Sequence, residues 1–354
     1  MMITSSICYG LKPVNFGIKD RQKSVTSHRD SISLHCIQRT SSETMSSAMR
    51  IAIAGAGGLA RYISEEFPKH GHSAIILTRS EKEYFRNRLN ITQVITDYSV
   101  PSIVTALRDC EILISVILSY AREFIDIHLN LIKACRLSPK CKRFIPSGFF
   151  GDIENYPDLP PLYSEIREPI RKILRQQTEI EWALVCNGWL VNYIVPKGNL
   201  YLMDIGEAFP IDIIRNRIVI PGTGKDAVDV TSTRDLAIAL ALLAIAPVWK
   251  PYVYVSGTKR CWNDLALLIQ ERYPAMREGK RVGSAQIPGT IQNSTDEEEL
   301  LLAHYQIYVP LGAVSLDPEK VEAHRRKFFA GLKFRSPRQL IDEVEEYTDK
   351  VVLS

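Results

Sequence analysis

The sequence lacks a hydrophobic run long enough to cross a membrane. Its longest apolar run, Leu236–Ala246, has eleven residues and ends at Pro247, whereas a membrane-spanning helix needs about 20. The sequence also lacks an excess of one charge, because residues 51–354 carry 37 basic and 37 acidic side chains. It therefore predicts neither a nucleic-acid partner nor a membrane partner.

Metal and hydrolase motifs are missing too. The seven cysteines include no C-x-x-C pair and the seven histidines no H-E-x-x-H, so no metal site is predicted. No G-x-S-x-G elbow is present, which disfavours a hydrolase of that type. Gly222–Asp226 resembles a phosphate-binding loop, but Val219 replaces its first glycine and no serine or threonine follows Lys225. The scattered cysteines predict free thiols in a reducing compartment, which favours a cytoplasmic location.

Residues 1–48 contain ten serines, three acidic residues and no sustained hydrophobic period. Such a segment buries too little apolar surface to offset its ordering entropy. It is interpreted as a dispensable tail or as a start-site artefact, since Met45 and Met49 precede the first predicted strand. The alternative is an organelle transit peptide, which would make the protein mitochondrial.

From residue 50 onward, short apolar runs alternate with helical stretches. Strands that are apolar throughout are typical of a parallel sheet covered on both faces, so we predict an α/β fold with a doubly wound parallel sheet. The predicted strands are 50–54, 73–78, 93–96, 111–117, 142–146 and 181–186, and the predicted helices include 121–137 and 163–177.

After Asn187 the regular pattern weakens, and a smaller C-terminal substrate lobe is expected over the carboxyl edge of the sheet. The expected domains are 49–200 for the cofactor and 201–354 for the substrate, with part of the sheet shared between them as an alternative. Predicted elements of the lobe are strands 217–220 and 251–255, helices 233–246 and 262–272, an irregular region 283–315 and a helix from Pro318.

A glycine-rich turn follows the first predicted strand. Gly55-Ala-Gly57-Gly58-Leu59-Ala60 fits the pattern G-x-G-x-x-G/A at the start of a helix. Gly55 permits the tight turn, Gly57 admits a pyrophosphate to the backbone, and Ala60 lets the helix pack closely on the sheet. Together with the free N–H groups of the helix start, this context predicts a dinucleotide site. A tight turn without a ligand is the alternative.

Arg79 follows the second predicted strand, 24 residues after Gly55. Sites that prefer NAD place an acidic residue there, whereas a guanidinium can pair bidentately with a 2′-phosphate. The sequence therefore predicts NADP(H) as the cofactor, with a solvated loop arginine as the alternative. Ser115, at the end of the fourth predicted strand, is also predicted to contact the cofactor.

Two further segments carry a family resemblance. The fifth strand leads into Arg143-Phe-Ile-Pro-Ser-Gly-Phe-Phe-Gly151, and a later strand ends in Trp182-Ala-Leu-Val-Cys-Asn-Gly-Trp189. With the glycine turn, they resemble the NmrA-like and isoflavone-reductase-like family of atypical short-chain dehydrogenases, most of all its fungal members of secondary metabolism. The resemblance covers residues 50–310. It implies a Rossmann fold and an NADPH-dependent reductase whose substrate is a small hydrophobic enone, ketone or imine. The protein is expected to be a monomer or a homodimer.

The sequence departs from the family at two positions that concern chemistry. Gly148 stands where the family usually has Glu, and Arg167 stands where its reductases have a catalytic Lys, in the frame set by Ile170 and Arg171. Arginine stays protonated, so Arg167 cannot relay a proton, although it can bind the nicotinamide ribose or polarise a substrate carbonyl. The missing lysine leaves a second hypothesis open, a non-catalytic, NAD(P)-sensing regulator.

Ser147, Tyr163 and Arg167 resemble the Ser-Tyr-Lys arrangement of ordinary short-chain dehydrogenases. Tyr163 and Arg167 are four residues apart and share a helix face, and a cation beside the phenol would lower its pKa and prepare it to protonate an oxyanion. The alternative is that Tyr163 packs at the surface and that Arg167 is exposed.

Side chains near the strand ends are predicted to line the substrate pocket. Aromatic groups at such turns form an apolar wall beside a cofactor. For Trp189, Asn192 and Tyr193, packing in the core under the second lobe is an equal alternative. The predicted substrate residues are Phe149, Asn187, Trp189, Asn192 and Tyr193.

Overall fold

A computed structural model describes residues 48–279, 281–347 and 351. The predicted tail, start-site artefact or transit peptide at 1–48 lies outside the described residues, except for Ala48.

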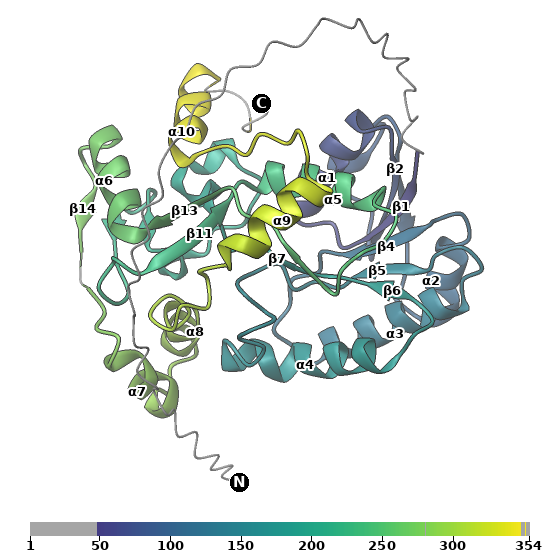
Figure 1. The fold of residues 1–354 in the computed structure, drawn as a ribbon, viewed down its shortest axis with the longest axis horizontal. Helices are drawn as coiled ribbons and strands as arrows, with labels where there is room; N and C mark the ends of the chain where they lie inside the picture. Colours follow the sequence, from purple (N-terminus) through teal and green to yellow (C-terminus); the bar gives the residue numbers. More distant parts are fainter. Residues whose placement is uncertain (1–47, 280, 348–350, 352–354) are drawn as a thin grey trace, which may run out of the picture. The chain divides into compact units, whose positions relative to one another are not determined.

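A six-stranded parallel sheet forms the core of the first half of the chain, which confirms the predicted doubly wound α/β fold (Figure 1). After β3 the chain returns to the middle of the sheet, where β4 pairs with the other side of β1. The connections that leave β1 and β4 therefore run in opposite directions, and a crevice is expected at the carboxyl ends of these two strands. Across the sheet the order is β3 (Ile91–Ile95), β2 (Ser73–Thr78), β1 (Arg50–Ala54), β4 (Ile112–Ser115), β5 (Arg143–Ile145) and β6 (Glu181–Trp182).

Helices cover both faces of this sheet (Figure 1). On one face lie α1 (Gly58–Lys69) and α5 (Thr233–Ala244), whose apolar side chains share a core with β1 and β2. On the other face lie α2 (Val100–Ala106), α3 (Glu123–Leu137) and α4 (Pro161–Gln176). The short η1 (Glu83–Phe85) follows β2.

The predicted strand 181–186 is divided at Ala183. β6 pairs with β5, whereas β7 (Leu184–Cys186) pairs in parallel with β12 (Tyr252–Tyr254). The backbone N–H of Ala183 still donates to Phe144 (3.2 Å), and that of the next residue donates to Pro251 (2.8 Å). The chain thus changes its pairing partner within one residue. Beyond β6 the neighbouring strand is β12, which comes from the second half of the chain.

The second half is built from small sheets and short helices. One sheet has the order β14 (Arg277–Glu278), β10 (Arg217–Ile218), β9 (Ile211–Asp212), and another has β13 (Thr258–Cys261), β11 (Ala227–Thr231), β8 (Trp189–Leu190). The remaining elements are η2 (Val191–Ile194), η3 (Lys197–Asn199), η4 (Gly206–Ala208), α6 (Trp262–Arg272), α7 (Gln286–Asn293), α8 (Glu297–Gln306), α9 (Pro318–Phe328) and α10 (Pro337–Glu346).

The prediction of an irregular region over 283–315 is wrong, because α7 and α8 lie within it. Asp296 begins α8, since its carboxylate accepts hydrogen bonds from the N–H groups of Glu298 and Glu299. The apolar residues of α8 are consecutive in sequence and do not recur at helical spacing, which explains why the pattern was not visible.

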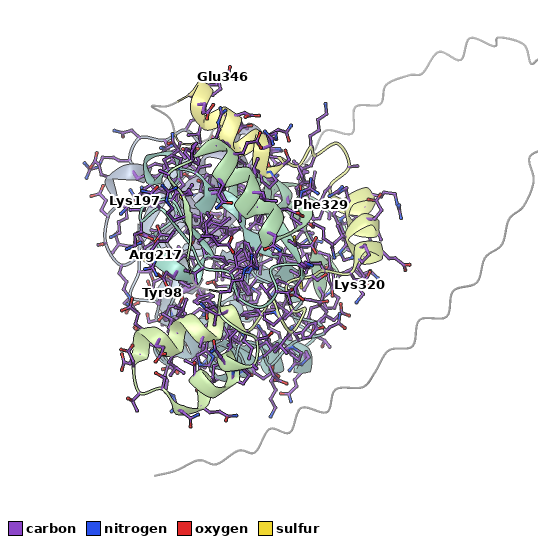
Figure 2. All side chains as sticks on the ribbon, turned by 90° about the vertical axis from the view of Figure 1, so that its left-hand side faces the viewer. Tyr98, Lys197, Arg217, Lys320, Phe329 and Glu346 are labelled. Carbon is purple, nitrogen blue, oxygen red and sulfur yellow. The ribbon has the colours of Figure 1, made fainter. Side chains whose placement is uncertain are left out.

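The helix α9 and the segment after it pack on elements of both halves of the chain. α9 contacts β12 and α5, and Phe329, just after it, is 1% exposed in the core that includes α1 and α5. Lys320 and Glu346 point outward (Figure 2). No helix in the described part of the chain is both long and apolar enough to span a membrane.

Candidate active site

A cavity of about 1020 Å³ lies at the carboxyl edge of the sheet. Its wall comes from the glycine turn, the loops after β2, β4 and β5, the start of α3, one face of α4 and the segment 202–205. This is the position at which doubly wound sheets bind their ligands, and the volume is at the upper end of the range for ligand pockets, about 300–1,000 Å³.

The glycine turn has the geometry that its residues predict. Gly55 has φ +110°, and a Cβ there would lie 3.1 Å from the backbone nitrogen of Ile117. A Cβ on Gly57 would meet no atom within 4 Å, so the backbone there is open to the cavity. No side chain caps the start of α1, which leaves its N–H groups available for an anion. Leu59 lines the cavity, and Ala60 is buried in the core.

Gly58 is held by a different contact. Residues 200–205, which we call the strap, cross the start of α1, and a Cβ on Gly58 would lie 2.7 Å from the carbonyl oxygen of Tyr201. The Tyr201 hydroxyl donates to Glu65 (2.6 Å) and so ties the strap to α1. Leu202 and Met203 then continue along the cavity wall. Gly58 is therefore required for the close approach of the strap.

Arg79 lies at the cavity end nearest β2, where its guanidinium pairs with the carboxylate of Glu123. Lys82 lines the same end, and its ammonium forms no ion pair or hydrogen bond with any residue that the structure describes. The sequence interpretation missed Lys82 and Glu123. The position of Lys82, three residues after Arg79 on one loop, was an available signal; that of Glu123 depends on how α3 packs.

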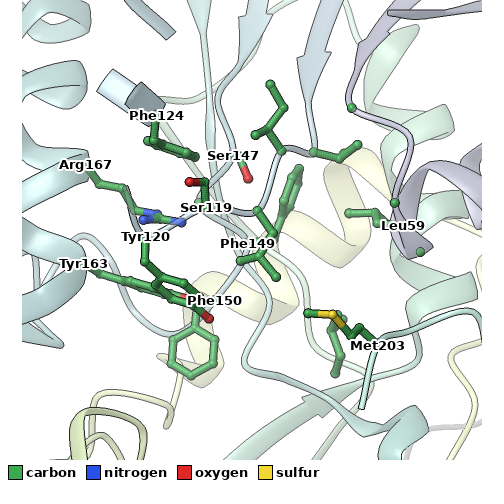
Figure 3. A pocket seen from close by; sticks show the side chains of 18 of the residues that line it. Leu59, Ser119, Tyr120, Phe124, Ser147, Phe149, Phe150, Tyr163, Arg167 and Met203 are labelled. Atoms are coloured by element: carbon green, nitrogen blue, oxygen red, sulfur yellow. The ribbon is translucent and has the colours of Figure 1, made fainter. Parts of the chain in front are cut away.

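Arg167 is buried at the other end of the cavity, with 4% exposure. Its guanidinium carbon lies 4.0 Å from the ring centre of Tyr163 and 4.4 Å from that of Phe124. Its Nη1 is buried without a hydrogen-bond partner among the described residues. Figure 3 shows the guanidinium directed toward Ser119 and Ser147. The alternative of an exposed helix residue is therefore wrong.

The Arg167 charge lowers the pKa of Tyr163, as expected, but this effect does not decide the net shift. Burial is the larger effect and raises the pKa of Tyr163 above its ordinary value. The geometry gives the reason, since the guanidinium lies over the ring and not beside the hydroxyl. The hydroxyl instead shares a hydrogen bond with that of Tyr305 (2.7 Å), which in turn is bonded to that of Tyr120 (2.5 Å).

Ser147 lines the cavity next to a neutral histidine. Its backbone N–H donates to Nε2 of His128 (3.4 Å), whose Nδ1 contacts the carbonyl oxygen of Phe124 (2.8 Å). Burial, together with the Arg167 charge, lowers the pKa of His128 to about 3, so the imidazole is neutral near pH 7. These two bonds require Nδ1 to carry the proton.

Phe149 and Tyr193 line the cavity as predicted from their positions at strand ends. The prediction missed six other aromatic wall residues, because their placement depends on how loops, α3 and the second half of the chain pack around the cavity. They are Tyr98, Tyr120, Phe124, Phe150, Tyr156 and Tyr308.

Four other predicted residues do not line the cavity. Ser115 and Asn187 are fully buried, and Trp189 packs at 4.8 Å between ring centres against Phe150. The amide oxygen of Asn192 accepts hydrogen bonds from the backbone and hydroxyl of Thr233, which ties η2 to the start of α5.

These features define a dinucleotide-binding protein of the Rossmann class with an aromatic pocket beside the cofactor site. No family model matches the chain. It is 46% identical over 306 residues to oxidoreductase swnR of Metarhizium robertsii, covering 86% of this chain and all of that protein. The chain belongs to the NmrA-like, isoflavone-reductase-like family of oxidoreductases, and the hypothesis of a non-catalytic regulator is not retained.

Solved structures share the fold at low sequence identity. The structure of isoflavone reductase has a TM-score of 0.65 at 20% identity, covering 82% of this chain and 98% of that one. AtPrR2, solved with NADP+ and (+)-pinoresinol, has a TM-score of 0.66 at 19% identity, covering 82% and 97%.

Proposed function

We propose that the protein is an NADPH-dependent reductase of a small, largely apolar metabolite of secondary metabolism that carries an enone, ketone or imine group. The supporting observation is that one cavity runs from the glycine turn and Arg79 to the buried guanidinium of Arg167. A dinucleotide laid along the turn would bring its reacting end toward Arg167, where aromatic walls leave room for a substrate.

The residues at the first end of the cavity fit NADPH. The uncapped start of α1 and the open backbone at Gly57 suit a pyrophosphate. Arg79 and Lys82 would bind the 2′-phosphate, which an unphosphorylated ribose lacks. When bound, NADPH supplies the hydride that reduces the substrate. The NADP+ complex of AtPrR2, a protein of the same fold, supports this choice.

The residues at the other end fit a reduction at a polarised double bond. Arg167 holds a fixed positive charge and an unpartnered N–H, which would stabilise negative charge that develops on a substrate oxygen. The hydroxyl of Tyr163 is protonated near pH 7 and is the proposed proton donor, and the Arg167 charge offsets part of the rise in pKa that burial causes. Tyr305 and Tyr120 extend this hydroxyl chain. Phe149 and Phe150 limit access of water to the reacting carbon.

Single-turnover absorbance of bound NADPH, mixed with a panel of enones, ketones and cyclic imines, tests the proposal. We expect oxidation of NADPH by at least one compound. Arg167→Ala should slow it about ten- to a thousandfold, the scale of one lost preorganised electrostatic contact, and Arg167→Lys should slow it less. Tyr163→Phe should slow it because only the proton donor is removed. Lys172→Ala, exposed on the same helix and outside the cavity, is the control.

The proposal is contradicted if NADPH binds and no compound in the panel oxidises it. If Tyr163→Phe leaves the rate unchanged, the proton must come from another group, and Ser147 is the next candidate in the wall.

A further inference from the structure

Two arginines on one face of α4 are buried without a counter-charge. Arg167 and Arg171, which we call the arginine pair, are 4% and 5% exposed and both line the cavity. Neither forms an ion pair with any carboxylate in the part of the chain that the structure describes. Arg171 donates to the carbonyl oxygen of Pro157 (2.7 Å), whereas the guanidinium of Arg167 lies over the rings of Tyr163 and Phe124.

The carboxylates nearest the cavity are all engaged elsewhere. Glu123 pairs with Arg79 at the far end of the cavity. Asp152 lines the wall, but its oxygens accept hydrogen bonds from the hydroxyl of Tyr254 (2.9 Å) and the side-chain amide of Asn155 (2.7 Å). One oxygen of Glu168, next to Arg167 in sequence, pairs with an arginine further along α4. The Glu168 charge favours the charged form of Arg171, but none of these carboxylates forms a described ion pair with Arg167.

The surrounding phenols do not supply negative charge either. Burial raises the pKa values of Tyr163, Tyr305 and Tyr308, so these groups are neutral near pH 7. A buried charge is unfavourable unless it is paired and hydrogen-bonded. The cavity therefore has an excess of positive charge at its substrate end, which a bound anion would relieve.

The cofactor's phosphates do not account for this charge. The pyrophosphate and 2′-phosphate would lie at the start of α1 and at Arg79, whereas the Arg167 guanidinium points toward Ser119 and Ser147, which follow β4 and β5 (Figure 3). The nicotinamide end that would approach Arg167 carries no negative charge.

We propose that the substrate of this protein carries a carboxylate, which pairs with Arg167 while the apolar remainder of the molecule lies against Phe149, Phe150 and Tyr193. This inference rests on the proposed function and narrows its substrate class. A carboxylate suits the site because a guanidinium offers it two parallel N–H donors and a full counter-charge, while its remaining N–H groups can still face the reacting oxygen.

Calorimetric titration of the NADPH-loaded protein with matched anionic and neutral probes tests the inference. The pairs are benzoate with benzamide and cinnamate with cinnamamide. We expect the anion of at least one pair to bind at least tenfold more tightly than its amide. Arg167→Met, titrated at an NADPH concentration that saturates it, should abolish that preference. Arg167→Lys, which keeps a cation, should retain part of the preference and covers the case in which Arg167→Met fails to fold.

Lys172→Met is the matched control, because it removes an exposed cation from the same helix that does not line the cavity. The inference is overturned if neither anion is preferred over its amide in the wild-type protein, or if the preference persists in Arg167→Met. The same titrations without NADPH separate it from the proposed function. Failure of NADPH to bind would reject the reductase and leave the anion preference to be judged from the unloaded protein.

Discussion

At the scale of single residues, two negative groups compete for Arg79: the carboxylate of Glu123 and the 2′-phosphate of a bound NADPH. Its partner Glu123 is more than half exposed, as is Arg79 itself, and such pairs contribute about 0–1 kcal/mol. A 2′-phosphate offers stronger, bidentate hydrogen bonds. We expect Arg79→Ala to weaken NADPH binding about ten- to a hundredfold, for a loss of about 1.5–3 kcal/mol, and to leave NADH binding nearly unchanged. Fluorescence titration with both nucleotides measures this.

Glu123→Gln makes the opposite change. It removes the competing carboxylate and should tighten NADPH binding by about two- to fivefold. Arg86→Ala is the control, because this exposed arginine pairs with Glu81 and Glu83 and does not line the cavity. Equal affinities of the wild-type protein for NADPH and NADH would contradict the assignment of Arg79.

The sequence predicted that Tyr163 and Arg167 lie together, but not the burial of these two side chains. Helical spacing placed Tyr163 and Arg167 on one face of α4, as the structure shows. Spacing carries no information on burial, so the raised pKa of Tyr163 and the partnerless guanidinium were not visible. Both depend on Phe124 and Tyr305, which come from distant segments of the chain.

At the scale of elements, the two glycines at the start of α1 have different tasks. A Cβ on Gly57 meets open space, whereas one on Gly58 would lie 2.7 Å from backbone of the strap. Gly58→Ala must therefore displace the strap, and we expect a loss of about 1–3 kcal/mol in unfolding free energy. Gly57→Ala should leave stability nearly unchanged and weaken NADPH binding, since the methyl group would occupy the cavity. Urea denaturation and nucleotide titration of both variants give the comparison.

The expectation for this pair is reversed if Gly57→Ala is the less stable variant. The expectation is also contradicted if Gly58→Ala loses affinity for NADPH without losing stability. That result would show that the pyrophosphate contacts Gly58 and that the strap does not.

The elements that the sequence predicted well are those with strong local signals. The strands 50–54 and 73–78 and the helix 262–272 have the predicted bounds, since apolar runs and turn residues delimit them. The exchange of partners at Ala183 and the helix α7 were missed. Pairing of β7 with β12 joins residues far apart in sequence, which no local pattern encodes.

At the scale of the whole molecule, buried histidines should make stability depend on pH. Burial lowers the pKa values of His72, His128, His304 and His324, that of His128 to about 3. Between about pH 6.5 and 3 the unfolded chain binds a proton at His128 that the folded chain does not, so stability falls as the pH falls. At about pH 5.5 this one residue makes the unfolding free energy about 1.4 kcal/mol smaller than it is at about pH 7.5.

His128→Gln should reduce the pH dependence by that amount, measured by urea unfolding at about pH 7.5 and 5.5. The difference between the two pH values is the readout, because the substitution also removes two hydrogen bonds. His70→Gln, at the partly exposed end of α1, serves as the control. An unchanged difference in His128→Gln would show that this histidine is protonated in the folded protein.

Removal of residues 1–47 should leave the folded part intact. The first strand begins at Arg50, and the backbone N–H of Met49 donates to His72 (3.2 Å), so the shortened chain must keep Met49. We expect a melting temperature within about 2 °C of that of the full chain and an unchanged affinity for NADPH. Deletion through Ala54, which removes β1, is the contrasting variant and should not fold. A fall of several degrees on removing residues 1–47 would show that they contribute contacts.

The supply of β12 and α5 by the second half of the chain restricts how members of this family can be recombined. A chimera joined at residue 200 would pair β7 and α1 of one protein with β12 and α5 of another, whose side chains did not evolve against them. The nucleotide-binding half is therefore not an exchangeable cassette. Residues 233–254 must travel with it, and a change of substrate has to arise by substitution in the walls of the pocket and not by exchange of whole lobes.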